Sequence, residues 1–136
     1  MTRPTGTERT RVLLIDDDES VRRAVGLLLE QEGFTVSTAS DGAEGLKAAI
    51  ASEFDIILLD IFMPEMNGLD CIRALKITRP RVPVLIITGH QDSELAQAAY
   101  RCGAQEILSK PVQKKKLVAT IRKYTGKSND GGPKCP

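Results

Sequence analysis

The sequence of 136 residues has only three cysteines, and no two of them have the C-x-x-C spacing. An odd number of thiols without that spacing gives no disulfide framework and predicts free thiols in a reducing compartment. Long apolar runs are also absent, and residues 1–11 contain no apolar segment, so neither a membrane span nor a secretory signal is expected. We therefore expect a cytoplasmic protein.

An excess of charge of one sign is missing as well. The chain has 19 basic and 18 acidic residues, a formal net charge of +1, which gives no field for direct binding to nucleic acid or to an anionic membrane. A chain of this length forms one ordinary domain, which we place at residues 11–125. Residues 1–10 and 126–136 are rich in small and polar residues, so we expect a flexible leader and a disordered tail.

Short apolar runs predict a sheet that is buried on both faces. Residues 56–59 are Ile-Ile-Leu-Leu without polar alternation, and residues 12–15 and 84–87 form similar runs; a fourth segment, Glu-Ile-Leu-Ser at 106–109, has a shorter apolar part. Uninterrupted runs of this length are typical of parallel strands that are covered on both sides. Residues 34–39 alternate between apolar and polar positions, which predicts a half-exposed edge strand.

The segments between these runs have helical spacing. We expect five helices, at about residues 20–32, 43–51, 69–78, 93–101 and 112–124. In the second helix, Leu46 and Ile50 are expected to face the core, and the fourth helix presents mostly alanine, so it should be weakly held. Five strands alternating with five helices predict an α/β fold with a parallel sheet and helices on both faces.

Several helical positions are not explained by a core-facing stripe. Gly26 costs about 1 kcal/mol relative to alanine inside a helix, and Leu27 lies roughly 120° from the centre of the apolar stripe. Both positions indicate a face with another purpose. The three lysines at 114–116, near the start of the last helix, gain nothing from the helix dipole and fit either a solvated face or a docking patch for an acidic partner.

Polar residues follow the predicted strands at the point where each strand ends. Asp16 and Asp17 follow the first apolar run, Asp60 the central one, Thr88 the next and Lys110 the last. Because ligands of open parallel sheets bind beyond the carboxyl ends of the strands, we expect these side chains to meet at one edge. Three carboxylates there repel one another, and a hard divalent cation such as Mg²⁺ relieves that repulsion.

The other polar residues of this edge suit a phosphoryl group. Thr88 can donate a hydrogen bond and Lys110 supplies a point charge to phosphoryl oxygens, while Gly89 allows the backbone to approach a ligand. A carboxylate backed by a metal ion, a hydroxyl and an ammonium group can be a nucleophile toward phosphorus and form an aspartyl phosphate. The predicted reaction is phosphoryl transfer by positioning and charge neutralisation.

These residues form an ordered pattern along the chain. Asp16-Asp17 comes first, then Asp60 followed by Met63-Pro64 and Gly68, then Thr88-Gly89, and finally Lys110-Pro111. The pattern resembles the receiver domain of bacterial two-component response regulators over about residues 10–125. The resemblance implies a doubly wound (βα)5, flavodoxin-like three-layer sandwich with strand order 2-1-3-4-5.

The resemblance also implies a set of site residues. Asp60 is the implied phosphoacceptor. Asp17 and Asp60 are the implied direct Mg²⁺ ligands, together with the backbone carbonyl of Phe62, while Asp16 binds through water.

The switch region departs in part from the family pattern. Thr88 and Lys110 match the residues that hold the phosphoryl oxygens and signal their arrival, and the Lys110–Pro111 bond is implied to be cis. Ile107 stands where the family usually has an aromatic switch residue. His90, two residues after Thr88 and next to Gly89, is interpreted as a loop residue at the mouth of the site.

The resemblance implies a signalling protein and not an enzyme beyond self-phosphorylation and autodephosphorylation. We expect a stand-alone receiver that takes its phosphoryl group from a sensor histidine kinase or a histidine phosphotransfer protein and acts on a downstream protein. In this family the first helix commonly docks the phosphodonor, so Arg23, Gly26 and Leu27 are the predicted partner surface. A homodimer through the face of the fourth helix, fifth strand and fifth helix is also compatible with the family.

Two alternatives share this class of topology. A haloacid dehalogenase-like phosphatase would use Asp16 as nucleophile, with Asp18, Thr88 and Lys110 in supporting roles. The chain has no later acidic pair for the metal and no room for a cap domain, and this reading leaves Asp60 without a role. A flavodoxin-like cofactor binder is disfavoured because an acidic loop after the first strand has the wrong sign for a cofactor phosphate.

Overall fold

The computed structural model describes residues 9–63, 66–89 and 93–126, with the backbone alone at Phe62, Met63 and Met66. Within these residues strands and helices alternate along the chain, except that two short strands, β4 and β5, stand between β3 and α3. The strands are β1 (Arg11–Ile15), β2 (Thr35–Ala39), β3 (Ile56–Leu59), β4 (Phe62–Met63), β5 (Met66–Asn67), β6 (Val84–Thr88) and β7 (Glu106–Ser109). The helices are α1 (Glu19–Gln31), α2 (Gly42–Ala51), α3 (Gly68–Thr78), α4 (Ser93–Cys102) and α5 (Lys114–Thr125).

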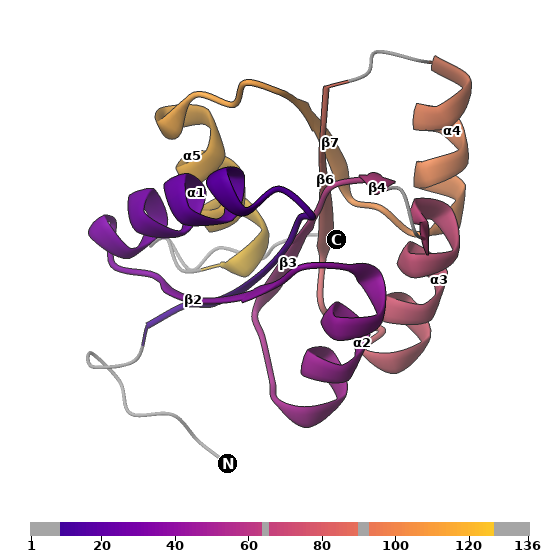
Figure 1. Ribbon diagram of the computed structural model, residues 1–136, viewed down its shortest axis with the longest axis horizontal. Helices are drawn as coiled ribbons and strands as arrows, with labels where there is room; N and C mark the ends of the chain where they lie inside the picture. Colours follow the sequence, from indigo (N-terminus) through magenta and orange to yellow (C-terminus); the bar gives the residue numbers. More distant parts are fainter. Residues whose placement is uncertain (1–8, 64–65, 90–92, 127–136) are drawn as a thin grey trace.

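The five longer strands form one parallel sheet in the order β2-β1-β3-β6-β7. Helices α1 and α5 cover one face of this sheet, and α2, α3 and α4 cover the other (Figure 1). When only the five strands of this sheet are numbered along the chain, β6 and β7 are the fourth and fifth, and the order is 2-1-3-4-5. The expected doubly wound, three-layer sandwich with this strand order is therefore confirmed. The chain reverses direction of winding at β1 and β3, which leaves a crevice beyond the carboxyl ends of these two central strands.

Two apolar cores lie on either side of the sheet. Ile57 of β3 packs in the core beneath α3, together with Ile72, whereas its neighbour Ile56 packs in the core beneath α1 and α5, with Leu29 and Leu117. Successive side chains of a strand point to opposite faces, and both faces are covered here. This is the physical reason why the central strands read as unbroken apolar runs.

Helix α2 differs from the sequence prediction in the face that it buries. Ile50, expected to face the core, is 62% exposed, while Leu46 is only partly buried. The buried face consists of small residues, Gly42, Gly45 and Ala49. A Cβ atom at Gly45 would collide with the side chain of Ile15, so the helix lies too close to β1 for a larger residue there. The prediction for Ile50 is wrong because close approach, and not apolar character, selects the buried face.

A short antiparallel pair, β4 with β5, precedes α3 and was not anticipated from the sequence, which predicted only a turn. Gly68 follows this pair, and a Cβ atom there would collide with the carbonyl oxygen of Ile61. Asn67 caps α3, since its side-chain oxygen accepts hydrogen bonds from the amides of Leu69 (2.8 Å) and Asp70 (3.4 Å). The motif around Gly68 thus serves to turn the chain sharply after β3.

The last two helices agree with the sequence only in part. In α4 the single buried residue is Ala99, as a mostly alanine face predicts. Helix α5 begins at Lys114 and not at Val112, and the Lys114 ammonium group lies 2.8 Å from a carboxylate oxygen of Glu32. Among the described residues no helix is long and apolar enough to cross a membrane.

Candidate functional site

The strand ends bring together residues that are far apart in the sequence. Asp16 follows β1, Asp60 follows β3, Thr88 ends β6 and Lys110 follows β7, and these four strands are consecutive neighbours in the sheet. Backbone hydrogen bonds continue the ladders past the strand ends, from the amide of Asp60 to the carbonyl of Ile15 (3.0 Å) and from the amide of Lys110 to the carbonyl of Thr88 (2.8 Å). The expected convergence at the carboxyl edge is therefore present.

Three carboxylates form an acidic cluster at this edge. Asp16, Asp17 and Asp60 each offer an oxygen atom within 4.8 Å of the others. Asp16 and Asp60 are buried, whereas Asp17 is exposed. Carboxylate oxygens are the ligands that Mg²⁺ takes in proteins, and a site open on the Asp17 side leaves room for waters and phosphate oxygens. The residues present therefore fit a hard divalent cation.

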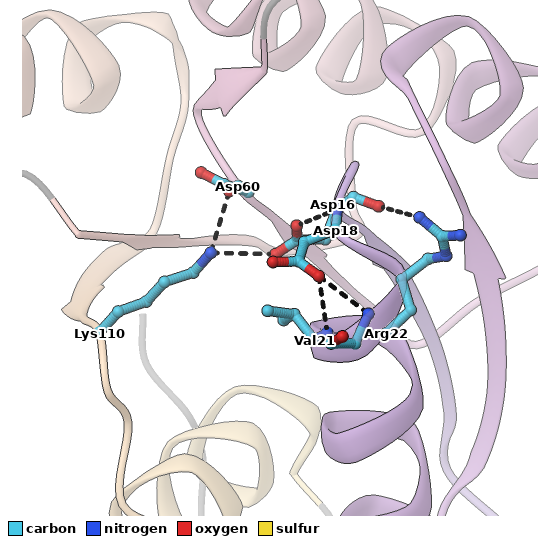
Figure 2. A network of polar contacts seen from close by, with 7 residues as sticks. Asp16, Asp18, Val21, Arg22, Asp60 and Lys110 are labelled. Carbon is cyan, nitrogen blue, oxygen red and sulfur yellow. Dashed lines mark hydrogen bonds and ion pairs between the residues drawn. The ribbon is translucent and has the colours of Figure 1, made fainter.

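Lys110 reaches into this cluster from β7. Its ammonium nitrogen lies 3.0 Å from Oδ2 of Asp60 and 3.1 Å from Oδ2 of Asp16 (Figure 2). Burial alone would lower the pKa of Lys110, but the hydrogen bonds that Lys110 donates to Asp60 and Asp16, together with the negative charges of these carboxylates, outweigh it, so the pKa is raised above its ordinary value. Lys110 is thus a fixed cation, and one positive charge offsets only part of the charge on three carboxylates.

The loop after β1 is held by its own polar groups. Oδ1 of Asp16 accepts a hydrogen bond from the amide of Asp18 (2.9 Å), and Oδ1 of Asp18 caps α1 by accepting from the amides of Ser20 (2.8 Å) and Val21 (3.4 Å). On the other side of the loop, Arg22 donates to the main-chain carbonyl of Asp16 over 2.7 Å (Figure 2). Asp is a common residue type at the N-cap of a helix, so the role of Asp18 is an ordinary one, but no sequence pattern singled out Arg22.

The remaining predicted residues lie around this cluster with different degrees of burial. Thr88 is buried, and Gly89 is exposed beside it. Ile107 is partly buried and packs against the core beneath α3 and α4. Phe62 lies in β4, but its side chain is outside the described part of the structure, and its role as a carbonyl ligand stays a prediction. His90 lies outside the described residues.

The bond between Lys110 and Pro111 is cis, so the expectation for this peptide is confirmed. The residues predicted as a partner surface are placed unequally. Leu27 is 58% exposed and Arg23 is exposed, with its guanidinium 3.5 Å from Glu19, but Gly26 is buried against β2 and offers little contact surface of its own.

Two grooves flank helix α1. The groove between α1 and β2 has a volume of about 460 Å³ and includes Leu27 and Arg23 along its side. The second groove, between α1 and α5, has a volume of about 580 Å³ and includes Asp60 and Lys110 in its wall. Its other walls are mostly apolar, from Val21, Ala24, Val25, Leu28, Val112 and Leu117. This apolar side of α1 is only partly covered, since Val21, Val25 and Leu28 are half-buried and Ala24 is exposed.

Comparison with known proteins agrees with this arrangement. The family model of the response regulator receiver domain matches residues 12–122. The chain belongs to this family. Members are receiver domains of two-component response regulators, for which aspartate phosphorylation and Mg²⁺ binding are general properties. This membership favours the receiver over the phosphatase and the cofactor binder.

The relatives include longer proteins and proteins of similar size to this receiver domain. The cell cycle transcriptional regulator CtrA of Caulobacter vibrioides is 33% identical over 118 residues, which cover 87% of this chain and 51% of CtrA. The chain thus spans about half the length of the curated relatives it matches. Chemotaxis protein CheY4 of Vibrio cholerae superposes with a TM-score of 0.82 at 32% identity, over 86% of this chain and 99% of CheY4.

A third relative was solved in a modified form. This response regulator from Burkholderia pseudomallei, which contains a phosphorylated aspartic acid, a calcium ion and citrate, has a TM-score of 0.80 at 29% identity. The match covers 86% of this chain and 69% of that one.

Proposed function

We propose that this chain accepts a phosphoryl group on Asp60 in a Mg²⁺-dependent reaction, with a sensor histidine kinase or a histidine phosphotransfer protein as donor. The observation that carries the proposal is the approach of three carboxylates to within 4.8 Å, with the Lys110 ammonium group on two of them. The phosphorylated aspartic acid and bound calcium of the Burkholderia pseudomallei relative support the same assignment.

Each residue has a role that follows from its chemistry. An Asp60 carboxylate oxygen attacks phosphorus, the bond between phosphorus and the donor histidine nitrogen breaks, and that nitrogen keeps the electron pair. Asp17, Asp60 and the carbonyl of Phe62 would hold Mg²⁺ directly and Asp16 would hold it through water; when bound, the ion neutralises charge on the carboxylates and phosphoryl oxygens. Lys110 then pairs with one phosphoryl oxygen, and Thr88 donates a hydrogen bond to another.

Helix α1 is proposed as the docking element for the donor. A donor histidine must reach Asp60, and the groove between α1 and α5 contains Asp60 in its wall. Its apolar lining suits the apolar side chains of a donor helix, and the exposed Leu27 offers a second contact on the other side of α1. The proposed partner surface therefore includes both sides of α1, with Arg23 at its edge.

The output is proposed to be a phosphorylation-dependent protein contact through the face of α4, β7 and α5. Tyr100 of α4 is 48% exposed, and the short α4 buries only Ala99, so this face can change at low cost in packing. A downstream protein is the proposed occupant. Chromatography with light scattering of the phosphorylated protein distinguishes this partner from a second copy of the chain, which would double the mass.

The test of the phosphoacceptor uses acetyl phosphate as a small donor with Mg²⁺. Intact-mass spectrometry should show the gain of one phosphoryl group that is stable in acid and labile in base. Asp60→Asn should show none, while Asp70→Asn, which removes an exposed carboxylate of α3, should be labelled like the wild type. Stoichiometric labelling of Asp60→Asn, with the group mapped to Asp16, would overturn the proposal.

A further inference from the structure

The main-chain carbonyl of Asp16 has a specific partner in Arg22 of α1. The Nη1 atom of Arg22 donates to this oxygen over 2.7 Å, a short hydrogen bond for a charged donor (Figure 2). The other polar groups of Asp16 are also engaged, by the carbonyl of Ala39, the amide of Asp18 and the ammonium group of Lys110. Every polar atom of Asp16 therefore has a hydrogen-bond partner. The atom that Arg22 holds is the carbonyl oxygen, which belongs to the peptide bond between Asp16 and Asp17.

That peptide bond joins two members of the acidic cluster. Because a peptide is planar, fixing the carbonyl oxygen of Asp16 also fixes the direction of the Asp17 amide and the starting point of the Asp17 side chain. Asp17 is exposed, and within the described residues no hydrogen bond or ion pair holds its carboxylate. Its position near Asp16 and Asp60 thus depends on the backbone and not on side-chain contacts.

We propose that Arg22 is a positioning residue for the metal ligands, which orients the Asp16–Asp17 peptide so that the three carboxylates converge. This inference rests on the proposed function, since it concerns the same Mg²⁺ site. Partners behind a metal ligand commonly change metal affinity by a factor of ten or more when they are removed, because the ligands lose their fixed orientation. Arg22 would act in this way through the backbone.

The direction in which Mg²⁺ affinity changes on substitution of Arg22 distinguishes a positioning role from a purely electrostatic one. A nearby guanidinium group repels a cation, so removal of the Arg22 charge alone should tighten Mg²⁺ binding. Loss of the hydrogen bond to the Asp16 carbonyl should weaken it, because the Asp17 side chain then samples more positions. If positioning dominates, the Arg22 variants bind Mg²⁺ more weakly in spite of the more favourable charge.

The experiment is calorimetric titration with Mg²⁺ of the wild type and of Arg22→Met, which keeps an apolar stem but loses the donor and the charge. Arg73→Met is the matched control, since it removes the same charge from an exposed helical position whose guanidinium pairs with Asp70. We expect the dissociation constant to rise about tenfold for Arg22→Met and to change less than about twofold for Arg73→Met.

A kinetic readout complements the titration. Labelling by acetyl phosphate should be slow for Arg22→Met at low Mg²⁺ and should approach the wild-type rate at saturating Mg²⁺, because the variant lowers occupancy and leaves Asp60 intact. If Arg22→Met does not fold, Arg22→Lys replaces it. That variant keeps the charge but loses the planar donor geometry, so weaker binding is again expected.

The outcomes are distinguishable. Unchanged or tighter Mg²⁺ binding by the folded Arg22 variants, with normal binding by the wild type, overturns this inference and leaves the proposed function standing. A wild type that takes up no Mg²⁺ overturns the proposed function and this inference with it.

Discussion

The ammonium nitrogen of Lys110 lies 3.0 Å from a carboxylate oxygen of Asp60 and 3.1 Å from one of Asp16. Two buried carboxylates thus share one cation that arrives from the last strand of the sheet. Without such a cation, the two carboxylates would repel one another at a buried edge of the sheet. Lys110 therefore offsets part of the negative charge beside the proposed nucleophile Asp60 before any metal is added.

This relationship predicts how the protein responds to loss of Lys110. Lys110→Met should lower the free energy of unfolding in the presence of a chelator by about 2 kcal/mol, because two buried carboxylates lose their counter-charge. Mg²⁺ should then stabilise the variant more than the wild type, because the metal is the cation that remains. Urea denaturation followed by circular dichroism, with and without Mg²⁺, measures both effects.

Lys115→Met is the control for this prediction, since Lys115 is exposed on α5. It should change neither the stability in chelator nor the gain from Mg²⁺. Equal stability of Lys110→Met and wild type in chelator would contradict the prediction that Lys110 offsets the repulsion between the carboxylates of Asp16 and Asp60.

Most residues of the site could be read from the sequence because Asp16, Asp60 and Thr88 follow unbroken apolar runs, whereas Lys110 follows the mixed segment Glu-Ile-Leu-Ser. Asp60 and Thr88 stand at the ends of central strands, and strand ends are predictable when both faces of a sheet are buried. To predict that these residues lie close together in space, one also needs the strand order, and that order came from the family resemblance. Arg22 could not be predicted, because its contact with the Asp16 carbonyl depends on the rotation of α1 about its axis, which no pattern fixes.

The buried face of α2 could not be predicted either, for a reason that concerns distance. Apolar periodicity pointed to Ile50, but the helix buries Gly45 and Ala49 and leaves Ile50 to solvent. Periodicity reports which residues can be buried, whereas the approach of α2 to Ile15 of β1 decides which ones fit. The glycine at position 45 permits this close approach, because an added Cβ atom would collide with Ile15.

Substitution by alanine should therefore change the free energy of unfolding in opposite directions at the two helical glycines, Gly26 and Gly45. Gly26→Ala should raise the free energy of unfolding by about 0.5–1 kcal/mol, because the new Cβ meets only Val36 at 3.9 Å and alanine favours the helix. Gly45→Ala should lower it by about 1–3 kcal/mol, because its Cβ collides with the fully buried Ile15. Urea denaturation of both variants provides the comparison, and a destabilised Gly26→Ala would contradict the prediction that the gain in helix propensity exceeds any cost of the new contact with Val36.

Phosphorylation should act most strongly on the segment from Thr88 to Leu108. Helix α4 buries only Ala99, so it loses little when it repacks, while Ile107 lies in the same core and can follow it. Amide hydrogen exchange with and without beryllofluoride and Mg²⁺ should therefore differ most in β6, α4 and β7. The helices α2 and α3 serve as the internal control, and an equal change in them would contradict a local switch.

Docking on α1 can be tested with one substitution made at three exposed positions. Ala24→Lys places a charged side chain in the apolar groove that contains Asp60, and Leu27→Lys places it on the other side of the helix. Both should slow transfer from a phosphohistidine donor that labels the wild type, by about tenfold for Ala24→Lys, because a desolvated contact worth about 1.4 kcal/mol is lost. Ile77→Lys on α3, where the side chain is 81% exposed, should leave transfer unchanged.

Labelling by acetyl phosphate is the control for the site itself in these variants. It should stay normal in all three, since a small donor needs no docking surface, and the melting temperatures should change little at exposed positions. Slower transfer in Ile77→Lys to the same degree would place the donor elsewhere or indicate a general effect of added charge. A large fall in the melting temperature of Leu27→Lys would return Leu27 to the core and remove it from the partner surface.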